Sequence, residues 1–333
     1  MPNNIKDESF SIEARQRTLV KVASLYYEEN RTQQEIAKIL DVSRSGVSRL
    51  LTEARERGVV EIIIHHPLRT ASHLEAELLS KFNLKDVRIL AGEYTKRDEV
   101  LQKLGGLAAV YLSDILQDGV RIGISWGTAL QYMIDALKPL NFPKTEVVQL
   151  IGATGSENLP NHGPILAQLL AKKLQGRSYQ IHAPLIVDNI RTKEVLLNEK
   201  NIKTGLEKAK QADIALLGIG STRADLNSLL RTGYLSIEET KKIRNLGAVG
   251  DVCAQHYNLN GDWLDIDINQ RVIGIGLESL KKIDTRIGVA GSSIKAQTIY
   301  GALKGCYVNV LISDEQAAKR ILSIYDSNNT KIN

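Results

Sequence analysis

The sequence has few cysteines and no long apolar run, and each absence excludes a class of protein. Its 333 residues include two cysteines, Cys253 and Cys306, in no CxxC or other metal-ligand spacing. We expect both to be small apolar side chains in or beside buried segments, in a reducing cytoplasm. No apolar stretch approaches the roughly 20 residues of a membrane span, and the polar start MPNNIKDESF lacks the apolar core of a secretory signal. The sequence thus predicts a cytoplasmic protein with no membrane partner.

Internal repeats, low-complexity tracts and nucleotide-binding fingerprints are also missing. The run Gly218-Ile-Gly-Ser221 lacks the third glycine of a dinucleotide fingerprint, and no acidic partner follows at the required distance of about 20 residues. His65 and His66 are adjacent, so in a strand they would face opposite ways and make a poor metal pair. We therefore expect no cofactor and no metal ion. The hydrophobic fraction of 43% and charged fraction of 24% are ordinary for a globular protein.

Residues 32–58 follow the pattern of two short helices joined by a tight turn. Thr32 and Glu35 form a capping box that starts the first helix. Asp41 lies at the turn, where an aspartate tolerates the left-handed conformation. Ser43 caps the second helix. Its buried face is predicted to consist of Val47, Leu50, Leu51 and Ala54.

The opposite face of the second helix carries short hydroxyls and arginines, which suit base edges and phosphates. This layout is that of a DNA-reading helix-turn-helix. The residues expected to contact DNA are Gln33, Arg44, Ser45, Ser48, Arg49 and Thr52. The alternative is an ordinary αα-hairpin, for which the capping box, the small Ala37 and this polar face would all be coincidental.

The flanking segments complete the expected head. Residues 16–30 read as a supporting helix, and residues 59–64, after Gly58, as a strand that forms a wing. The inward side chains of the supporting helix are predicted to be Leu19, Val22, Ala23, Tyr26 and Tyr27. Residues 1–66 contain ten lysines and arginines and ten aspartates and glutamates, so the head has no formal net charge. DNA affinity must therefore come from local charge, helix N-termini and pairing of heads in an oligomer.

Beyond the head the chain is long enough for one large α/β domain. We expect a helix-turn-helix domain over 1–66, a linker over 67–73 and a large domain over 74–333. Strand patterns alternate with helical patterns in that domain, which indicates a doubly wound, mainly parallel sheet with helices on both faces. The predicted strands begin the segments 87–90, 120–125, 147–155, 213–221, 285–303 and 308–313.

Four glycine-containing loops follow these strands, at the edge where such sheets bind ligands. They are 123–128, 152–155, 218–221 and 291–295. Lys295 lies in the first turn of its helix, where it would neutralise an anion. A glycine is needed at each turn simply to make the bend, but the four loops together favour a small anionic ligand.

A series of motifs resembles the sugar-binding transcriptional regulators of the SorC/DeoR type. In order they are TQQEIAKILDVSRSGVSRLLTEARERGVVEI, GISWGTAL, VVQLIGATG, ADIALLGIGS, RTGYLS, GAVGDVC, GVAGSSIKAQTIYGAL and YVNVLISDEQAA. The resemblance runs from about Arg17 to Leu322. It implies a large domain similar to the sugar-phosphate isomerase and deaminase fold, and an effector that is a phosphorylated sugar.

The loops and the resemblance together give a candidate effector pocket. Its residues are Gly123, Ser125, Trp126, Gly127, Thr128, Gly152, Gly218, Gly220, Ser221, Tyr234, Asp251, Cys253, Gly291, Ser292 and Lys295. The resemblance implies that Asp251 accepts sugar hydroxyls, although an aspartate after Gly250 also suits a turn. Some relatives hold an open-chain sugar phosphate as a lysine Schiff base. VVQLIGATG has no lysine, so we expect a non-covalent ligand.

The sequence thus predicts a DNA-binding regulator of a carbohydrate-utilisation operon, controlled by a phosphorylated sugar or polyol and acting as a homotetramer or dimer. One alternative is a sugar-phosphate isomerase or deaminase with a DNA-binding head. Asp251 and Glu157 are acid–base candidates for it, but no constellation of His, Asp or Glu recurs among the loops, so we expect no catalytic residues and no enzyme. The other is an NAD(H)-sensing redox regulator, which the broken fingerprint disfavours.

Overall fold

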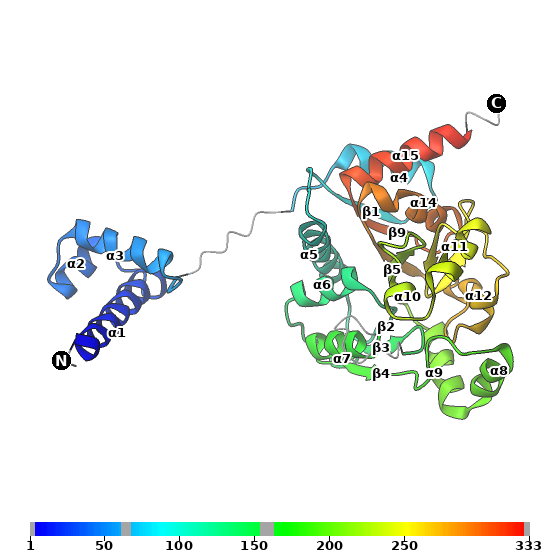
Figure 1. Cartoon of the computed structure of the whole chain (residues 1–333), viewed down its shortest axis with the longest axis horizontal. Helices are drawn as coiled ribbons and strands as arrows, with labels where there is room; N and C mark the ends of the chain where they lie inside the picture. Colours follow the sequence, from blue (N-terminus) through cyan, green and yellow to red (C-terminus); the bar gives the residue numbers. More distant parts are fainter. Residues whose placement is uncertain (1–3, 61–67, 154–162, 330–333) are drawn as a thin grey trace. The chain divides into compact units, whose positions relative to one another are not determined.

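The computed structural model describes residues 4–60, 68–153 and 163–329, and the chain divides into two compact units (Figure 1). Met1–Pro67 is called the head below, and Leu68–Asn333 the large domain. The predicted linker over 67–73 is too long. Thr70 already pairs with Leu90 in an isolated bridge, and the Ala71 N–H donates to the carbonyl oxygen of Ile89 at 2.8 Å. The chain therefore joins the large domain from Leu68 onward.

The head consists of helices whose starts are fixed by local signals. Thr32 accepts the N–H of Glu35, and the Glu35 carboxylate accepts the N–H of Thr32 at 2.8 Å, which confirms the predicted capping box. Asp41 ends the first helix of the pair at φ 50° and ψ 48°, the left-handed conformation expected at the turn. Ser43 accepts the N–H of Gly46 and caps the next helix. The elements are α1 (Asn4–Ala23), the π-helix η1 (Ser24–Glu28), α2 (Gln33–Leu40) and α3 (Arg44–Glu56).

The core of the head is formed by one face of each helix. Its buried side chains are Leu19, Val22, Leu25, Ile36, Val47, Leu50, Leu51 and Ala54. The prediction that Tyr27 points inward is wrong, because its side chain is 40% exposed. The π-turn of η1 holds an extra residue per turn, so the helix face rotates there and Leu25 takes the inward position. The predicted wing covers residues 59–64. Val59 and Val60 form a bend and pack against this core, and the rest of the wing lies outside the described residues.

The large domain is built on a sheet whose main path is entirely parallel. Its strand order is β1-β9-β8-β5-β2-β3-β4, which confirms the predicted mainly parallel sheet. The strands are β1 (Asp86–Leu90), β2 (Arg121–Ile124), β3 (Glu146–Gln149), β4 (Arg177–Tyr179), β5 (Ile214–Ser221), β8 (Thr285–Val289) and β9 (Val310–Asp314).

A short antiparallel hairpin extends β5 beyond the parallel part. It consists of β6 (Gly250–Val252) and β7 (Gln255–Tyr257), and β6 pairs with the end of β5 so that Asp251 stands opposite Gly220. The turn residues Cys253 and Ala254 have φ values of 53° and 60°. Neither is glycine or asparagine, so the usual sequence signal of a two-residue hairpin is missing. This explains why the hairpin was not predicted.

Helices cover both faces of the sheet, as Figure 1 shows. Alternate residues of β5 enter different cores, with Leu216 on one face and Leu217 on the other. One face carries α5 (Arg97–Ile115), α6 (Thr128–Ala136) and α7 (Gly163–Leu174), and the other carries α4 (Ser72–Lys81), α14 (Ala296–Lys304) and α15 (Glu315–Asn329).

Three helices of 9–11 residues and several shorter ones complete the large domain among the described residues. They are α8 (Ile190–Asn198), α9 (Lys200–Lys210), α10 (Ser228–Arg231), α11 (Ile237–Asn245), α12 (Asp267–Arg271), α13 (Leu277–Leu280) and the 3₁₀-helix η2 (Ser293–Lys295). Within the described residues, every helix is too short or too polar to cross a membrane.

Candidate functional site

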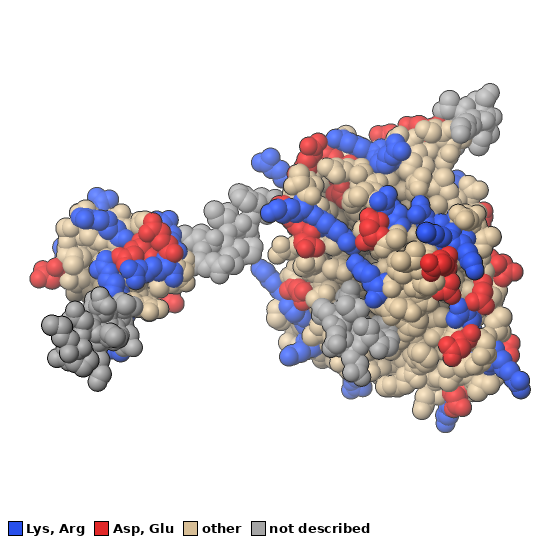
Figure 2. All heavy atoms as spheres, in the orientation of Figure 1, with Lys and Arg blue, Asp and Glu red and all other residues tan. Residues whose placement is uncertain are grey.

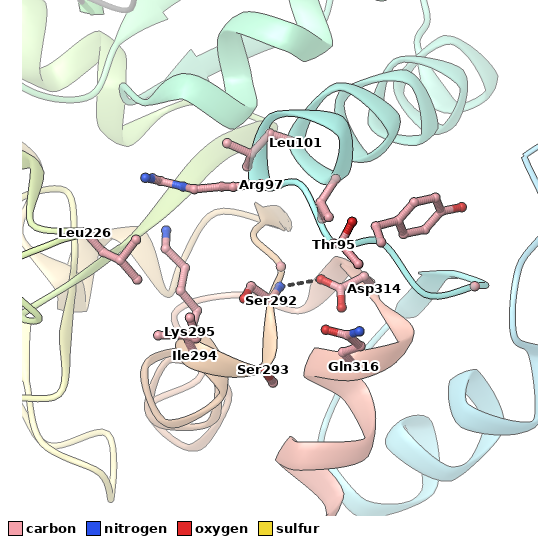
Figure 3. Close-up of a pocket in the computed structure, with 14 residues that line it drawn as sticks. Thr95, Arg97, Leu101, Leu226, Ser292, Ser293, Ile294, Lys295, Asp314 and Gln316 are labelled. Carbon is pink, nitrogen blue, oxygen red and sulfur yellow. Dashed lines mark hydrogen bonds between the residues drawn. The ribbon is translucent and has the colours of Figure 1, made fainter.

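Two adjoining cavities open at the carboxyl ends of the parallel strands. The larger cavity has a volume of about 430 Å³, and the smaller cavity about 50 Å³. Four side chains line both: Arg97, Leu101, Leu226 and Lys295. Figure 3 shows Arg97 and Lys295 extending toward the same space, from α5 and from the start of α14. The cavities therefore form one site with two chambers.

Lys295 is held at the boundary between the chambers. Its Nζ donates to the carbonyl oxygen of Ile219 at 2.7 Å, so the ammonium group is fixed beside the end of β5. Removal from water, together with positive Arg97, lowers the pKa of Lys295 to about 8, and Asp251 opposes that shift. An anion bound beside Lys295 would raise this pKa again.

Two arginines that the glycine loops did not reveal join Lys295. Arg97 is the first residue of α5, and Arg231 is the last residue of α10. Removal from water and the nearby positive charge of Arg97 lower the pKa of Arg231. A sequence signal existed for Arg231, because it opens the RTGYLS motif. Arg97 follows the loop after β1 and carried no such signal.

Asp251 is the acidic group of the smaller cavity. Burial raises its pKa, while His256, Lys295 and the backbone N–H of Ala254 act in the opposite direction. Gly220 makes room for it, because a Cβ on that residue would lie 1.9 Å from Asp251 Oδ1. Gly220 is thus required by the position of the carboxylate.

The smaller cavity also receives the N-terminus of α6. Gly127 caps this helix at φ 132°, and Thr128 is its first residue. Backbone N–H groups in a first helical turn have no partner within the helix and favour an anion. Gly218 approaches from β5, where a Cβ would lie 2.5 Å from the carbonyl oxygen of Trp126. The chamber is narrow because β5 and this loop are in direct contact.

The loop after β8 forms the floor of the larger cavity and is fixed by Asp314. Asp314 Oδ2 accepts the backbone N–H of Ser292 (Figure 3), and Oδ1 accepts the N–H of Ala317 at 3.0 Å. Gly291 is needed here, since a Cβ would lie 2.1 Å from Asp314 Oδ2. Both carboxylate oxygens of Asp314 are therefore used by the backbone.

The structure brings nine of the predicted effector residues to these cavities and leaves six away from them. Those that line a cavity are Trp126, Gly127, Thr128, Gly218, Gly220, Asp251, Gly291, Ser292 and Lys295. Those that line neither are Gly123, Ser125, Gly152, Ser221, Tyr234 and Cys253.

The hydroxyl groups among these six residues form hydrogen bonds with the protein backbone. Ser125 Oγ accepts the N–H of Gly218 at 3.1 Å, and Ser221 Oγ accepts the N–H of Arg223 at 3.3 Å. The Tyr234 hydroxyl donates to the carbonyl oxygen of Ala153 at 3.3 Å.

The two glycines and the cysteine of this group pack inside the protein. A Cβ on Gly123 would meet the Leu150 side chain at 2.4 Å, and one on Gly152 would meet the Pro184 carbonyl oxygen at the same distance. Cys253 is buried in the hairpin turn, as expected, and burial raises its pKa. Cys306, which was also expected in or beside a buried segment, has an exposed side chain between two buried neighbours.

The predicted DNA-binding face lies on the outside of α3. Arg44, Ser45, Ser48, Arg49 and Thr52 are exposed there, and Gln33, at the start of α2, is partly exposed. The Thr52 hydroxyl donates to the Ser48 carbonyl oxygen at 3.1 Å. These side chains are thus presented together to solvent.

Glu53 limits the positive charge of the head. It forms ion pairs with Arg15 at 2.6 Å and with Arg57 at 2.9 Å. Lys and Arg side chains lie beside Asp and Glu side chains on the face of the head seen in Figure 2. Among the described residues on that face, basic and acidic side chains are thus interspersed.

Comparisons with known proteins cover nearly the whole chain. Residues 66–323 match the family described as a putative sugar-binding domain, and residues 12–57 match sigma-70, region 4. The deoxyribonucleoside regulator of Bacillus subtilis (strain 168) is 33% identical over 93% of this chain and 98% of its own length. The sorbitol operon regulator of Klebsiella pneumoniae is 30% identical over 92% of this chain and 98% of its own length.

Solved structures agree with these relationships. The full-length sorbitol operon regulator SorC from Klebsiella pneumoniae superposes with a TM-score of 0.75 at 30% identity, covering 92% of this chain and 98% of that one. A putative sugar-binding domain of a transcriptional repressor from Vibrio fischeri covers 77% of this chain, and all of its own length, with a TM-score of 0.71 at 28% identity. The helix-turn-helix, the parallel sheet and the order of the motifs therefore have one explanation: the chain belongs to the SorC/DeoR-type sugar-binding transcriptional regulators.

Proposed function

We propose that this protein regulates transcription of a carbohydrate-utilisation operon by binding operator DNA through α3, under the control of a phosphorylated sugar or polyol in the two-chambered site. The proposal that the ligand has a phosphate rests on one observation: three cationic side chains line the smaller cavity, Arg97, Arg231 and Lys295. Within the lining of that cavity, only Asp251 is acidic. The site therefore favours an anion.

The parts of the smaller cavity divide between the groups of such a ligand. The three cations and the N-terminus of α6 suit a phosphate, because charged donors and the N–H groups of a first helical turn both stabilise its oxygens. Asp251 suits a hydroxyl, which donates to a carboxylate. An anion alone would be repelled by Asp251, so the arrangement favours a molecule that has both groups.

The enzymatic alternative gains no support from the residues around the cavities. Acid–base catalysis needs two groups that exchange protons with the substrate. The lining carboxylates within the described residues are Asp251 and Asp314, and both oxygens of Asp314 accept backbone N–H groups. Lys295, whose pKa is about 8, also lines the cavities, and its Nζ donates to the carbonyl oxygen of Ile219. Glu157 lies outside the described residues.

A short path of hydrogen bonds links the site to the segment that leaves the head. The Ala91 N–H donates to the Arg69 carbonyl oxygen at 2.8 Å, and the Tyr94 hydroxyl donates to the Ala91 carbonyl oxygen at 3.0 Å. Tyr94 and Arg97 line the larger cavity. A ligand that contacts this loop would therefore act on Arg69, near the start of the large domain. Control of this kind requires that the ligand bind one state of the protein more tightly than the other.

The protein is further proposed to act as a homo-oligomer, as a tetramer or a dimer. A head with no net charge binds DNA weakly on its own, and two α3 helices on neighbouring half-sites would add their contacts. Light scattering of the purified protein, with and without operator, would measure this state. If a single copy of the protein were found on the operator, the proposal of an oligomer would be wrong.

The effector is tested by thermal shift against a panel of pentose, hexose and polyol phosphates. A ligand at 100 times its Kd stabilises the folded state by about 2.7 kcal/mol, which is easily measured. Hits are then added to the protein bound to an operator selected from random DNA, and anisotropy reports the change in affinity. Borohydride would reduce any lysine Schiff base with ribose 5-phosphate to a stable adduct. Because we expect a non-covalent ligand, this treatment should leave the protein mass unchanged. Absence of any hit, or of any effect on DNA binding, would overturn the proposal.

A further inference from the structure

The two chambers of the site differ in chemistry. The smaller cavity has three cations, but the larger cavity has only the two cations that it shares, Arg97 and Lys295, among its described lining residues. Its walls are instead largely apolar, formed by Tyr94, Val100, Leu101, Leu226 and Ile294. The larger cavity is therefore built for a different part of the ligand.

A second anionic group is poorly suited to this chamber. Asp314 lies in its lining, and its carboxylate would repel a second phosphate. The Tyr94 hydroxyl is already bonded to Ala91, so the ring rather than the hydroxyl is left as a wall. Thr95, Ser293 and Gln316 add a few neutral polar groups at the margins. The lining fits an uncharged, mainly apolar group with some hydrogen-bonding atoms.

The size of the chamber points the same way. A volume of about 430 Å³ falls within the roughly 300–1,000 Å³ in which proteins enclose drug-sized ligands. The smaller cavity, at about 50 Å³, is less than twice the roughly 30 Å³ share of one water molecule, so the ring of a sugar phosphate extends into the larger cavity. An unsubstituted pentose or hexose then fills only part of the larger cavity and leaves the rest to water. Water against apolar walls is unfavourable, so a ligand that displaces it gains affinity.

We propose that the effector is a phosphorylated sugar with an apolar substituent at the end away from its phosphate, and that this substituent occupies the larger cavity. The inference rests on the proposed function, since it assumes that a phosphate binds between Arg97, Arg231 and Lys295. Two sources share this chemistry: aryl glycoside phosphates, in which the substituent is an aglycone, and nucleoside monophosphates, in which it is a base.

Calorimetry with matched ligand pairs tests the proposal. The first pair is glucose 6-phosphate and phenyl β-D-glucoside 6-phosphate, and the second is ribose 5-phosphate and adenosine 5′-monophosphate. Burial of one aromatic substituent is expected to tighten binding at least tenfold in one pair, from about 25 cal/mol per Å² of apolar area. The pair that shows the gain identifies the source.

A matched pair of variants locates the substituent. Ile294 is 49% exposed and lines the larger cavity, whereas Ile190 is 47% exposed on α8 and lines neither cavity. Ile294→Asn is expected to reduce the advantage of the substituted ligand, measured as the ratio of the two Kd values, at least threefold. Ile190→Asn should leave this ratio unchanged.

The possible results separate this inference from the proposed function. If the unsubstituted phosphates bind, and substitution adds nothing in either pair, the apolar-substituent proposal is overturned while the proposed function stands. If no member of either pair binds, and the panel of sugar phosphates gives no hit, the proposed function itself fails. A gain that survives Ile294→Asn undiminished would place the substituent elsewhere and also overturn the proposal.

Discussion

The backbone N–H of Ala91 donates to the carbonyl oxygen of Arg69 across 2.8 Å. Arg69 is the second residue of the large domain, and Ala91 directly follows β1. The strand that leads into the ligand site is thus bonded to the segment through which the large domain receives the head.

Removal of this bond should uncouple the ligand from DNA binding. Ala91→Pro deletes the donor N–H. We expect it to bind effector and operator separately with nearly normal affinity, but to lose most of the effector-dependent change in operator affinity. Ala91→Ser keeps the N–H and should retain the response. Anisotropy titrations with and without effector measure this, and a full response in Ala91→Pro would exclude the coupling path.

Arg49 is expected to contact the operator. Arg49→Ala removes an exposed cation from α3, so operator affinity should fall by roughly 1–3 kcal/mol, or about 5- to 150-fold, while thermal stability and effector binding stay unchanged. Lys38→Ala removes the same charge from α2 and should have a much smaller effect. Wild-type operator affinity in Arg49→Ala would remove this residue from the recognition face.

Lys295 is expected to carry the response to the effector. Lys295→Ala removes a charge-assisted contact worth about 1.5–3 kcal/mol, so effector affinity should drop roughly 10- to 100-fold. Basal operator binding should persist, because Lys295 lies in the large domain. Calorimetry and anisotropy together check both statements. An unchanged response would mean that the anion binds elsewhere.

The pKa of Lys295, about 8, sets a pH window for effector binding. Lys295 is mostly protonated at pH 7 and mostly neutral at pH 9, while a phosphate ester is already doubly ionised above its second pKa of about 6. Effector affinity should therefore fall about tenfold from pH 7 to pH 9. Lys295→Arg should bind with little change over this range. A flat profile in the wild type would contradict the prediction.

The ligand-free protein should respond to pH in the opposite sense. The unfolded chain, with a lysine pKa of about 10.4, binds more protons than the folded state between pH 8 and pH 10. Lys295 thus adds stability as the pH rises through this window. Denaturant titration at pH 7.5 and pH 9.5 measures the free energy of unfolding of the wild type and of Lys295→Ala. The wild type should gain stability relative to the variant at the higher pH. An equal difference between the two proteins at both pH values would contradict the prediction.

Gly220 is expected to be intolerant of any side chain. In Gly220→Ala the new Cβ would stand 1.9 Å from Asp251 Oδ1, so the buried hairpin or the strand must move. Overpacking of this kind costs about 1–3 kcal/mol of unfolding free energy, and displacement of Asp251 should also weaken effector binding. Gly276→Ala, with open space around its Cβ position, should cost much less. Equal melting temperatures for the two variants would contradict the argument.

The head and the sheet could be predicted because their signals are local. The capping box of Thr32, the left-handed Asp41 and the strand–helix alternation each depend on residues close in sequence. Tyr27 was misplaced because the π-turn of η1 changes the helical period, and no residue type announces such a turn.

The site was predicted only in part because its residues meet through the topology of the sheet. The glycines in the loops were visible in the sequence. The sequence does not distinguish a glycine that makes space for a ligand from one such as Gly123, which makes space for the Leu150 side chain. Arg97 follows β1, at the edge of the sheet, yet it lines a cavity with residues of β5 and the loop after β2. That meeting is set by the strand order, which the alternating pattern left open.

The pairing of Glu53 with Arg15 and Arg57 has a consequence for how the protein finds its operator. Attraction to the chromosome at large grows with the number of phosphates that a protein neutralises, and competing sites number in the millions. A head in which acidic and basic charges cancel is only weakly attracted to these non-operator sites. We therefore expect the head to contribute little to the binding of non-operator DNA, so that discrimination of the operator depends on the specific contacts of α3.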